Sequence, residues 1–411
     1  MIFDRPSRAA AIASFVAFAA GCGGPAEVVP PLWIGRPNDH LPASTASNVF
    51  WVEASIDGEP GPQVIVDTGA PIALLYVDEF NGAVPVGAGR VATLTLGRTT
   101  FWKASTVGDH DSRGRSLAPS GLPDGGIVGF SVFGQNEMSF DYKAGEIVIA
   151  AGSPPAGVGA ALEIPFTIEG GGAGPVSEGG EIIRFPASRV VLPATVEGIQ
   201  LQMLLDTGAS WVGLRSSVYN TLVEDHRGQL SVDASLATGR ATTNITRLRS
   251  VTVAGAEVLD PPAAAATVVD GLLDNLAIEV GHPVDGLLGA PFLREFYVAI
   301  DYPNHVLRLY RYADESHVLD EYRRVGVEIS VVLSPGANNF VVEKVYPGTD
   351  AERQGIHVLD NIQAIDGELL FGLDLPTVDR KLRGAVGSTH ELRLAGPRTV
   401  VVAVDELLPL P

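Results

Sequence analysis

The chain has 411 residues, of which 46% are apolar and 18% charged, and its net charge is −20. This composition excludes an intrinsically disordered chain, and the length leaves room for two or three domains. The 48 acidic residues outnumber the 28 basic ones and no basic stripe occurs, which excludes nucleic acid as a partner.

The first 22 residues have the layout of a bacterial secretory signal. Two arginines precede an apolar run from Ala9 to Ala20, which is too short to span a membrane, and small residues follow it. The one cysteine of the chain, Cys22, comes directly after these small residues, so no internal disulfide can form. We therefore expect residues 1–22 to be a lipoprotein-type signal peptide.

The sequence AAGCGG around Cys22 resembles a lipobox, the processing site of bacterial lipoproteins. The resemblance implies that Cys22 is acylated and becomes the new N-terminus, although Ala19 stands where the motif prefers leucine. Gly23 is no inner-membrane retention signal, so the resemblance implies a lipid-anchored protein of the bacterial cell envelope, at the outer membrane and facing the periplasm or the outside. Plain secretion and an uncleaved anchor remain alternatives. Residues 23–44, rich in proline and glycine, are expected to form a flexible tether.

The central part of the chain contains two copies of one unit. Residues 49–70 align with residues 189–209, and each copy has two strand-like stretches joined by an acidic-Gly turn and followed by Asp-Thr-Gly-Ala. The similarity returns downstream, where DGGIVGF begins at Asp124 and DGLLGAPF begins at Asp285. The 47 glycines and 29 prolines favour turns and short strands over long helices. We therefore expect a mainly β fold with two related halves.

Each copy places one acid, Asp67 or Asp206, at the end of an apolar strand. Burying a carboxylate as an anion is costly, so its repetition indicates that the two acids meet. Two carboxylates at close range cannot both ionise and would share one proton. One of them could then deprotonate a water molecule while the other donates to a carbonyl oxygen. This chemistry is general acid–base amide hydrolysis without a metal or a covalent intermediate.

Each copy resembles a lobe of an aspartic protease, and Asp-Thr-Gly-Ala is closer to the retroviral type of this family than to pepsin. The resemblance implies two tandem retropepsin-like β-barrel lobes, residues 45–152 and 153–312, which form one bilobal aspartic protease. It assigns catalysis to Asp67 and Asp206. It also implies supporting residues in the two acidic loops and in the aliphatic-aliphatic-Gly triplets beneath them: Thr68, Gly69, Ala70, Thr207, Gly208, Ala209, Ile127, Val128, Gly129, Leu287, Leu288 and Gly289. In the family, the threonine after each Asp locks the two loops by reciprocal backbone hydrogen bonds.

The same resemblance leads us to expect a flap and a mild pH optimum. The flap hairpin is expected either in the stretch that begins at Ala237 or in its counterpart PVGAGRVATLTLGRTTF in the first copy, and the sequence leaves this choice open. Ala70 and Ala209 occupy positions where pepsin-like enzymes have a hydroxyl that can bond the catalytic carboxylate. Without that bond the pKa values of the two acids should be higher, which predicts a mildly acidic to near-neutral optimum.

Residues 322–411 resemble a PDZ domain, a small α+β unit. The order of strand, short helix, strand and turn matches, but Thr349-Asp350 replaces a Ser-Pro pair and Leu359 replaces a glycine. The resemblance implies a peptide or protein ligand that adds a strand to the edge of a sheet.

The sequence thus predicts a monomeric aspartic-type endopeptidase, a hydrolase, that acts on polypeptides and is held to a membrane by a lipid anchor. No cofactor and no metal site are expected, because adjacent side chains in the loop GDHDSRG do not converge on one ion. The alternative is a catalytically idle envelope lipoprotein that binds peptides without cutting them. A third arrangement pairs each copy with its twin in another chain, but covalent linkage favours pairing within the chain.

Overall fold

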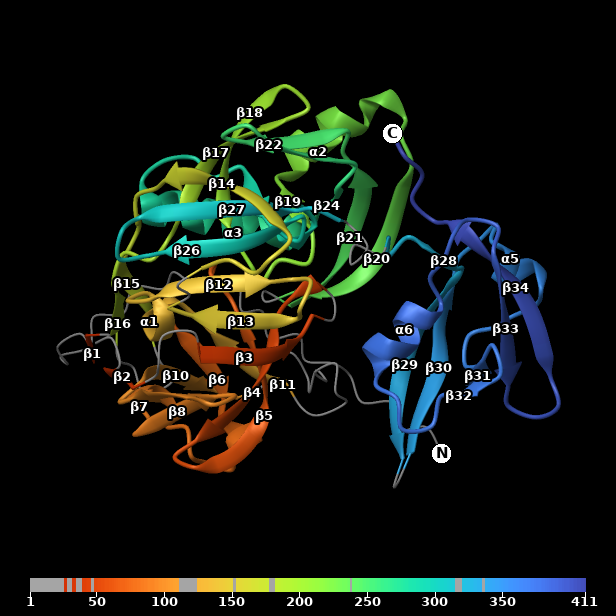
Figure 1. Cartoon of the computed structure of the whole chain (residues 1–411), viewed down its shortest axis with the longest axis horizontal. Coiled ribbons are helices and arrows are strands. Elements are labelled where there is room, and N and C mark those ends of the chain that lie inside the picture. The colour runs from red at the N-terminus through yellow and green to blue at the C-terminus, as the bar shows by residue number, and fades with distance from the viewer. Residues whose placement is uncertain are drawn as a thin grey trace.

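The computed structural model describes residues 26–27, 32–34, 39–45, 48–110, 124–150, 153–176, 182–236, 239–314, 320–334 and 337–411. The fold is mainly β, which confirms the predicted fold class (Figure 1). The expected signal peptide over residues 1–22, including Cys22, lies outside the described residues. Within the described ranges, no helix has the length and apolar character needed to cross a membrane.

The first repeat contains a β-hairpin that leads into Asp67. The strands around this acid are β4 (Trp51–Ile56), β5 (Glu59–Val66), β6 (Ala73–Tyr76) and β11 (Asp124–Val128). In the hairpin turn, Asp57 and Gly58 have φ angles of 52° and 85°, which suit a two-residue connection between twisted strands. β11 pairs in parallel with β5 and antiparallel with β6, so it lies between the two strands that flank the Asp67 loop.

The second repeat arranges its strands around Asp206 in the same way. These strands are β17 (Val191–Val196), β18 (Ile199–Leu205), β19 (Val212–Leu214) and β25 (Gly286–Leu288). Its hairpin turn also has two residues with positive φ, Glu197 at 48° and Gly198 at 87°. β25 pairs in parallel with β18 and antiparallel with β19, and thus lies between the strands that flank the Asp206 loop.

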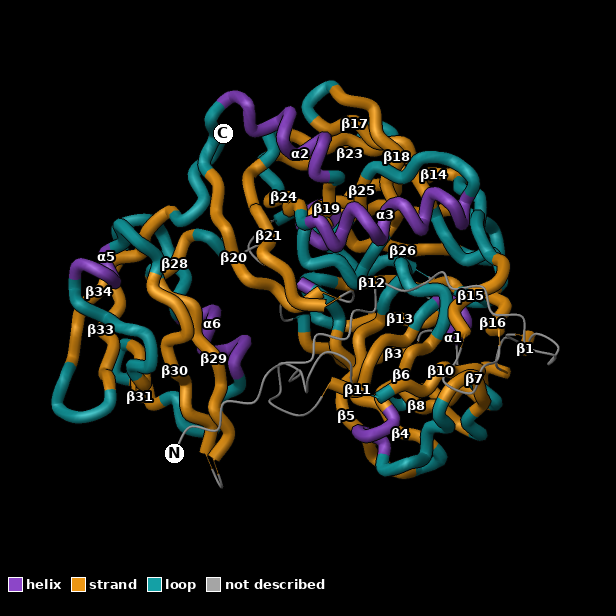
Figure 2. Tube along the Cα trace, turned by 180° about the vertical axis from the view of Figure 1, so that it is seen from behind, coloured by secondary structure: helices purple, strands orange, loops and turns teal. Residues whose placement is uncertain are grey.

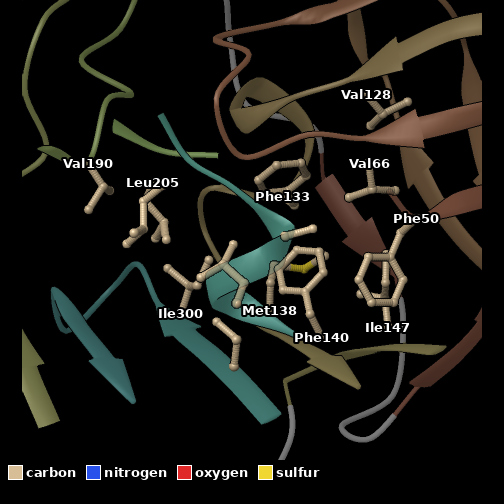
Figure 3. Close-up of a cluster of buried hydrophobic side chains, with 14 of the residues drawn as sticks. Phe50, Val66, Val128, Phe133, Met138, Phe140, Ile147, Val190, Leu205 and Ile300 are labelled. Carbon is tan, nitrogen blue, oxygen red and sulfur yellow. The ribbon is translucent and has the colours of Figure 1, made fainter. Parts of the chain in front are cut away.

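Strands from both repeats join in one part of the large sheet (Figure 1). Their order is β14 (Val158–Pro165), β27 (Val306–Tyr312), β26 (Phe296–Asp301), β12 (Glu137–Asp141), β13 (Glu146–Ile149) and β3 (Asp39–Ser44). β12 of the first repeat pairs antiparallel with β26 of the second, with Phe140 opposite Val298. Apolar side chains from both repeats form one buried cluster, part of which Figure 3 shows. The two repeats therefore share a core.

The flexible tether predicted for residues 23–44 is wrong at its C-terminal end. Asp39–Ser44 form β3, which pairs with β13 and β4, and the side chain of Leu41 is fully buried. Leu41 supplies the inward side chain that a strand needs on its core face. The proline and glycine content of the segment gives no indication of this strand. Earlier in the segment, β1 (Ala26–Glu27) and β2 (Leu32–Ile34) pair with later strands.

A long hairpin distinguishes the second repeat. It consists of β20 (Gln229–Leu236) and β21 (Gly239–Arg247), and β21 pairs with β24 (Pro262–Ala265). The hairpin thus begins before the stretch from Ala237 in which a flap was expected. At the equivalent place in the first repeat, the shorter strand β7 (Gly87–Arg90) pairs with β10 (Ser105–Asp109).

The two repeats contain further short elements, some of which Figure 2 labels. They are η2 (Val77–Phe80), β8 (Thr93–Leu96), β9 (Thr99–Trp102), α1 (Phe130–Phe133), β15 (Gly172–Val176), β16 (Ile182–Phe185), α2 (Ser216–Leu222), η3 (Val223–Asp225), β22 (Ser250–Val253), β23 (Ala256–Leu259), α3 (Thr267–Val280) and α4 (Ala290–Leu293). In the rear view, α2 and α3 lie on the second repeat.

The C-terminal residues form an α+β unit with its own apolar core. Its elements are β28 (Arg323–Val325), β29 (Val327–Ser334), β30 (Ala337–Val345), α5 (Asp350–Arg353), β31 (Asn361–Ile365), β32 (Glu368–Leu369), α6 (Leu375–Lys381), β33 (Thr389–Leu394) and β34 (Thr399–Glu406). β29 is the end strand of its sheet. Leu359 has a φ of 75°, in the left-handed region that favours the glycine it replaces.

This C-terminal unit packs against the second repeat, beside the β20–β21 hairpin (Figures 1 and 2). A small apolar cluster joins the two parts and contains Val232, Ile245, Ala264, Tyr322, Tyr346, Leu407 and Leu408. The last residues of the chain belong to this contact, because Arg247 Nε donates to the carbonyl oxygen of Leu408 at 2.7 Å.

Candidate active site

The two predicted acids occupy equivalent positions after the second strand of each hairpin. The backbone N–H of Asp67 donates to the carbonyl oxygen of Val128 at 3.0 Å. The backbone N–H of Asp206 donates to the carbonyl oxygen of Leu288 at 3.2 Å. The middle residue of each aliphatic triplet therefore anchors the acid of its own repeat.

Reciprocal hydrogen bonds between Thr68 and Thr207 hold the two acidic loops together. The backbone N–H of Thr68 donates to Thr207 Oγ1 at 3.1 Å, and the backbone N–H of Thr207 donates to Thr68 Oγ1 at 3.0 Å. Each hydroxyl then donates at 3.1 Å to a carbonyl oxygen of the other repeat, Thr68 to Leu205 and Thr207 to Val66. Both threonines are buried, so every donor and acceptor in this arrangement has a partner away from water.

The glycine of each loop lies against the carboxylate of the other repeat. A Cβ on Gly69 would be 2.7 Å from Asp206 Cγ, and a Cβ on Gly208 would be 2.5 Å from Asp67 Cγ. Each glycine N–H also donates to the carboxylate of its own loop, at 2.7 Å in Gly69 and 2.9 Å in Gly208. The loops can approach this closely only because neither position carries a side chain.

The glycines of the two triplets allow a second close approach, beneath the loops. A Cβ on Gly129 would be 2.4 Å from the carbonyl oxygen of Ala70, and one on Gly289 would be 2.7 Å from that of Ala209. The residue after each of these glycines donates its N–H to the same carbonyl oxygen at 2.9 Å. The remaining members of the triplets, Ile127 and Leu287, are buried.

Burial raises the pKa of both acids, and the contact between them adds to this rise in Asp206 and opposes it in Asp67. The two side chains share a hydrogen bond. The pKa of Asp206 is held well above its usual range by burial and, next, by the negative charge of Asp67. Burial also raises the pKa of Asp67, but the hydrogen bond with Asp206 opposes this rise. Because two carboxylates in contact cannot both ionise, the pair holds one shared proton.

Arg189 is a functional candidate that sequence reasoning missed. Its guanidinium donates to the carbonyl oxygen of Gly69, in the acidic loop of the other repeat, and forms a two-point ion pair with Glu279 of α3, with both distances at 2.9 Å. The positive charge of Arg189 lowers the pKa of both acids, an effect smaller than those of burial and of the contacts within the pair. The only sequence signal was a charged residue before an apolar strand, where the first repeat has Val49.

The structure gives no metal-binding arrangement at the loop GDHDSRG in its described part. His110 Nδ1 lies 3.0 Å from Asp78 Oδ1, and the loop beyond His110 falls outside the described residues. Across the described ranges, no group of three or more His, Cys, Asp or Glu side chains is placed to hold a metal ion.

Several known proteins are similar to parts of this chain. No curated protein sequence matches it. Among solved structures, an aspartic proteinase from Irpex lacteus is 15% identical, with 68% of this chain and 99% of that chain covered and a TM-score of 0.40. A retropepsin-like aspartic protease from Rickettsia conorii is 18% identical over 37% of this chain and 91% of its own, with a TM-score of 0.24. A photosystem II D1 C-terminal processing protease is 28% identical over 22% of this chain and 24% of its own, with a TM-score of 0.19.

The family comparison concerns the second repeat. The matching segment contains Asp206 and its loop, together with the triplet that ends at Gly289. Residues 192–292 of the chain match the family model of the aspartyl proteases.

Proposed function

We propose that the protein is an aspartic endopeptidase in which Asp67 and Asp206 form one catalytic pair. The observation that carries this proposal is the contact between two acids, one from each repeat, which share a hydrogen bond; Asp206 is buried and Asp67 is partly buried. The family match over residues 192–292 supports it. An idle peptide-binding protein would not need two acids held so closely, since their burial costs stability.

In the reaction that we propose, Asp67 starts as the anion and Asp206 starts with the shared proton. Asp67, the anion, accepts a proton from a water molecule as that water attacks the peptide carbonyl carbon. Asp206 donates its proton to the carbonyl oxygen, which gives a neutral tetrahedral diol. Asp67 then passes its proton to the amide nitrogen while Asp206 regains one from a hydroxyl of the diol. The C–N bond breaks, an amine and a carboxylic acid leave, and the pair returns to its starting state.

The proposal extends to the two ends of the chain. The N-terminal sequence supports a lipid anchor at Cys22 in the bacterial envelope. For the C-terminal unit we propose a PDZ-like role in holding a peptide of the substrate or of a partner. β29 is an end strand that contacts α6. Arg324 of β28 pairs through Nη1 with Asp379 of α6 at 2.7 Å, and its buried Nε and Nη2 have no hydrogen-bond partner.

Single replacements of the acids test the catalytic proposal. Asp67→Asn and Asp206→Asn should each lower the hydrolysis of short peptides by a factor of about 100 or more, because neither step can run with one carboxylate. Asp78→Asn, which changes an exposed acid of the first repeat, is the matched control. The measurements are kcat on a broad peptide library, inhibition by a pepstatin-type compound, and the melting temperature of each variant.

Two results would count against the proposal. One is a variant that keeps most of its activity, which would mean that its acid takes no part in the reaction. The other is a folded wild-type protein that binds peptides of the library and cleaves none, which would favour the idle binding protein instead.

A further inference from the structure

The two acidic loops differ in how one backbone carbonyl is bonded. In the first repeat, the N–H of Ser131 donates to the carbonyl oxygen of Pro71 at 3.1 Å. The equivalent of Ser131 in the second repeat is Pro291, which has no N–H to donate. The equivalent carbonyl, that of Ser210, instead accepts from the side-chain amide of Asn48 at 3.4 Å. A side chain of the first repeat thus replaces a missing backbone donor of the second.

Asn48 is held in this position by a partly buried ion pair. Its Oδ1 accepts from Arg294 Nη1 at 3.0 Å, and its Nδ2 also donates to Glu321 Oε2 at 2.9 Å. Arg294 and Glu321 form the pair at 2.8 Å, and the side chain of each is only 13% exposed. Because Glu321 lies after the second repeat, a residue of the C-terminal segment orients the donor that supports the Asp206 loop.

A second contact joins the same segment to the same loop. Trp211, five residues after Asp206, donates its indole N–H to the hydroxyl of Tyr322 at 2.8 Å. Tyr322 is buried in the apolar cluster between the second repeat and the C-terminal unit, and its carbonyl oxygen accepts from the N–H of Leu407 at 2.8 Å. The first repeat has Ile72 in place of Trp211, so it cannot make this contact.

We propose that Glu321 and Tyr322 are positioning residues for catalysis. They act through Asn48 and Trp211 to keep the Asp206 loop in the geometry that lets Asp206 share a proton with Asp67. This inference rests on the proposed protease function. The C-terminal segment is then part of the catalytic support, in addition to any peptide that the C-terminal unit binds. Small displacements of a catalytic group are enough to slow a reaction strongly.

The test uses full-length variants and matched controls. Tyr322→Phe removes the acceptor for Trp211 but keeps the ring, and Glu321→Gln keeps an acceptor but removes the charge. Tyr346→Phe is the control for the first, since Tyr346 lies in the same cluster and bonds Glu328 instead of the loop. Glu406→Gln is the control for the second, since Glu406 pairs with Arg247 and Arg323 at the same junction.

We expect kcat on a short peptide to fall about 3- to 10-fold in each variant, with KM nearly unchanged. Tyr322→Phe loses the hydrogen bond from Trp211, and Glu321→Gln loses the charge that pairs with Arg294. The pH profile of kcat should shift in these variants and stay unchanged in the controls. Adding Pro291→Ser to Glu321→Gln supplies the N–H that the first repeat has at Ser131, and should restore part of kcat.

The outcomes separate this inference from the proposed function. If wild type cleaves peptides and the two variants match their controls in kcat and pH profile, the inference is wrong and the protease proposal stands. The inference is also wrong if kcat falls in proportion to the loss of melting temperature, equally in the variants and in their controls. If wild type cleaves nothing, both proposals fall.

Discussion

The two acidic loops make the same contacts with each other, here called inner bonds, and different contacts with a side chain outside the loops, here called outer braces. Inside, the threonine and glycine contacts repeat almost atom for atom across the two loops. Outside, each loop is braced by a side chain that precedes the first hairpin of the other repeat. Arg189 donates to the carbonyl oxygen of Gly69, and Asn48 donates to that of Ser210. The first brace is charged and the second is neutral.

This difference shows which contacts of the acid pair must be alike in the two repeats. The inner bonds set the distance between the carboxylates, so both loops must make them in the same way. The outer braces differ in charge: Arg189 lowers the pKa of both acids, whereas Asn48 is neutral. Arg189 and the partly buried ion pair of Arg294 with Glu321 place fixed charges unevenly around two nearly equal loops.

The largest effect should come from breaking the inner contact at the glycines. Gly69→Ala and Gly208→Ala each place a methyl group less than van der Waals distance from the carboxylate of the other repeat. We expect both to lower kcat/KM by a factor of about 100 or more, because the acids can no longer meet. Gly271→Ala in α3 is the control, since a Cβ there has nothing within 4 Å. Activity close to wild type in either loop variant would show that the loops need not be this close.

A smaller and symmetric loss should follow from breaking the threonine lock. Thr68→Val or Thr207→Val keeps the side-chain shape but leaves one buried N–H and one buried carbonyl of the other repeat unpaired. Each unpaired group should lower the free energy of unfolding by about 1–3 kcal/mol. Urea denaturation measures this, with Thr95→Val, which loses a hydrogen bond to Thr100 in a hairpin of the first repeat, as the control. Unequal losses in the two loop variants would contradict the symmetry of the inner bonds.

The inner contacts could be predicted from the sequence because a short local motif encodes them twice. Asp-Thr-Gly-Ala and the aliphatic-aliphatic-Gly triplets each carry their own chemistry, and the repeat indicates that the two copies meet. The outer braces could not be predicted. Arg189 reaches a residue 120 positions away and Asn48 one 162 positions away, and no motif surrounds either.

The same limit applies to the two ends of the folded region. Composition suggested a tether up to residue 44, but residues 39–44 form a strand between β13 and β4 whose Leu41 is fully buried. Both acids and both triplets come before residue 312, which suggests a C-terminal unit with no part in the pair. Glu321 reaches the Asp206 loop through Asn48, and Tyr322 reaches it through Trp211, which argues otherwise. These contacts depend on tertiary structure that no local pattern reveals.

The smallest effect concerns the charged outer brace. Arg189→Met removes a positive charge that lowers the pKa of both acids, so both pKa values should rise. Both limbs of the pH–rate profile should then move to higher pH, with a modest loss of kcat. Arg215→Met, which breaks an ion pair with Asp274 of the same helix α3, is the control and should leave the profile in place. A shift to lower pH would contradict the role of the Arg189 charge.

The pH dependence of kcat/KM for the wild-type protein on a short peptide tests the central claim most directly. The reaction needs one proton on the pair, and burial raises the pKa of both acids, that of Asp206 most. The active state is therefore lost at low pH when both acids are protonated, and at high pH when neither is. We predict a bell-shaped profile with an optimum at mildly acidic to near-neutral pH. An optimum in strong acid, or a rate that does not depend on pH, would contradict a buried pair of acids that shares one proton.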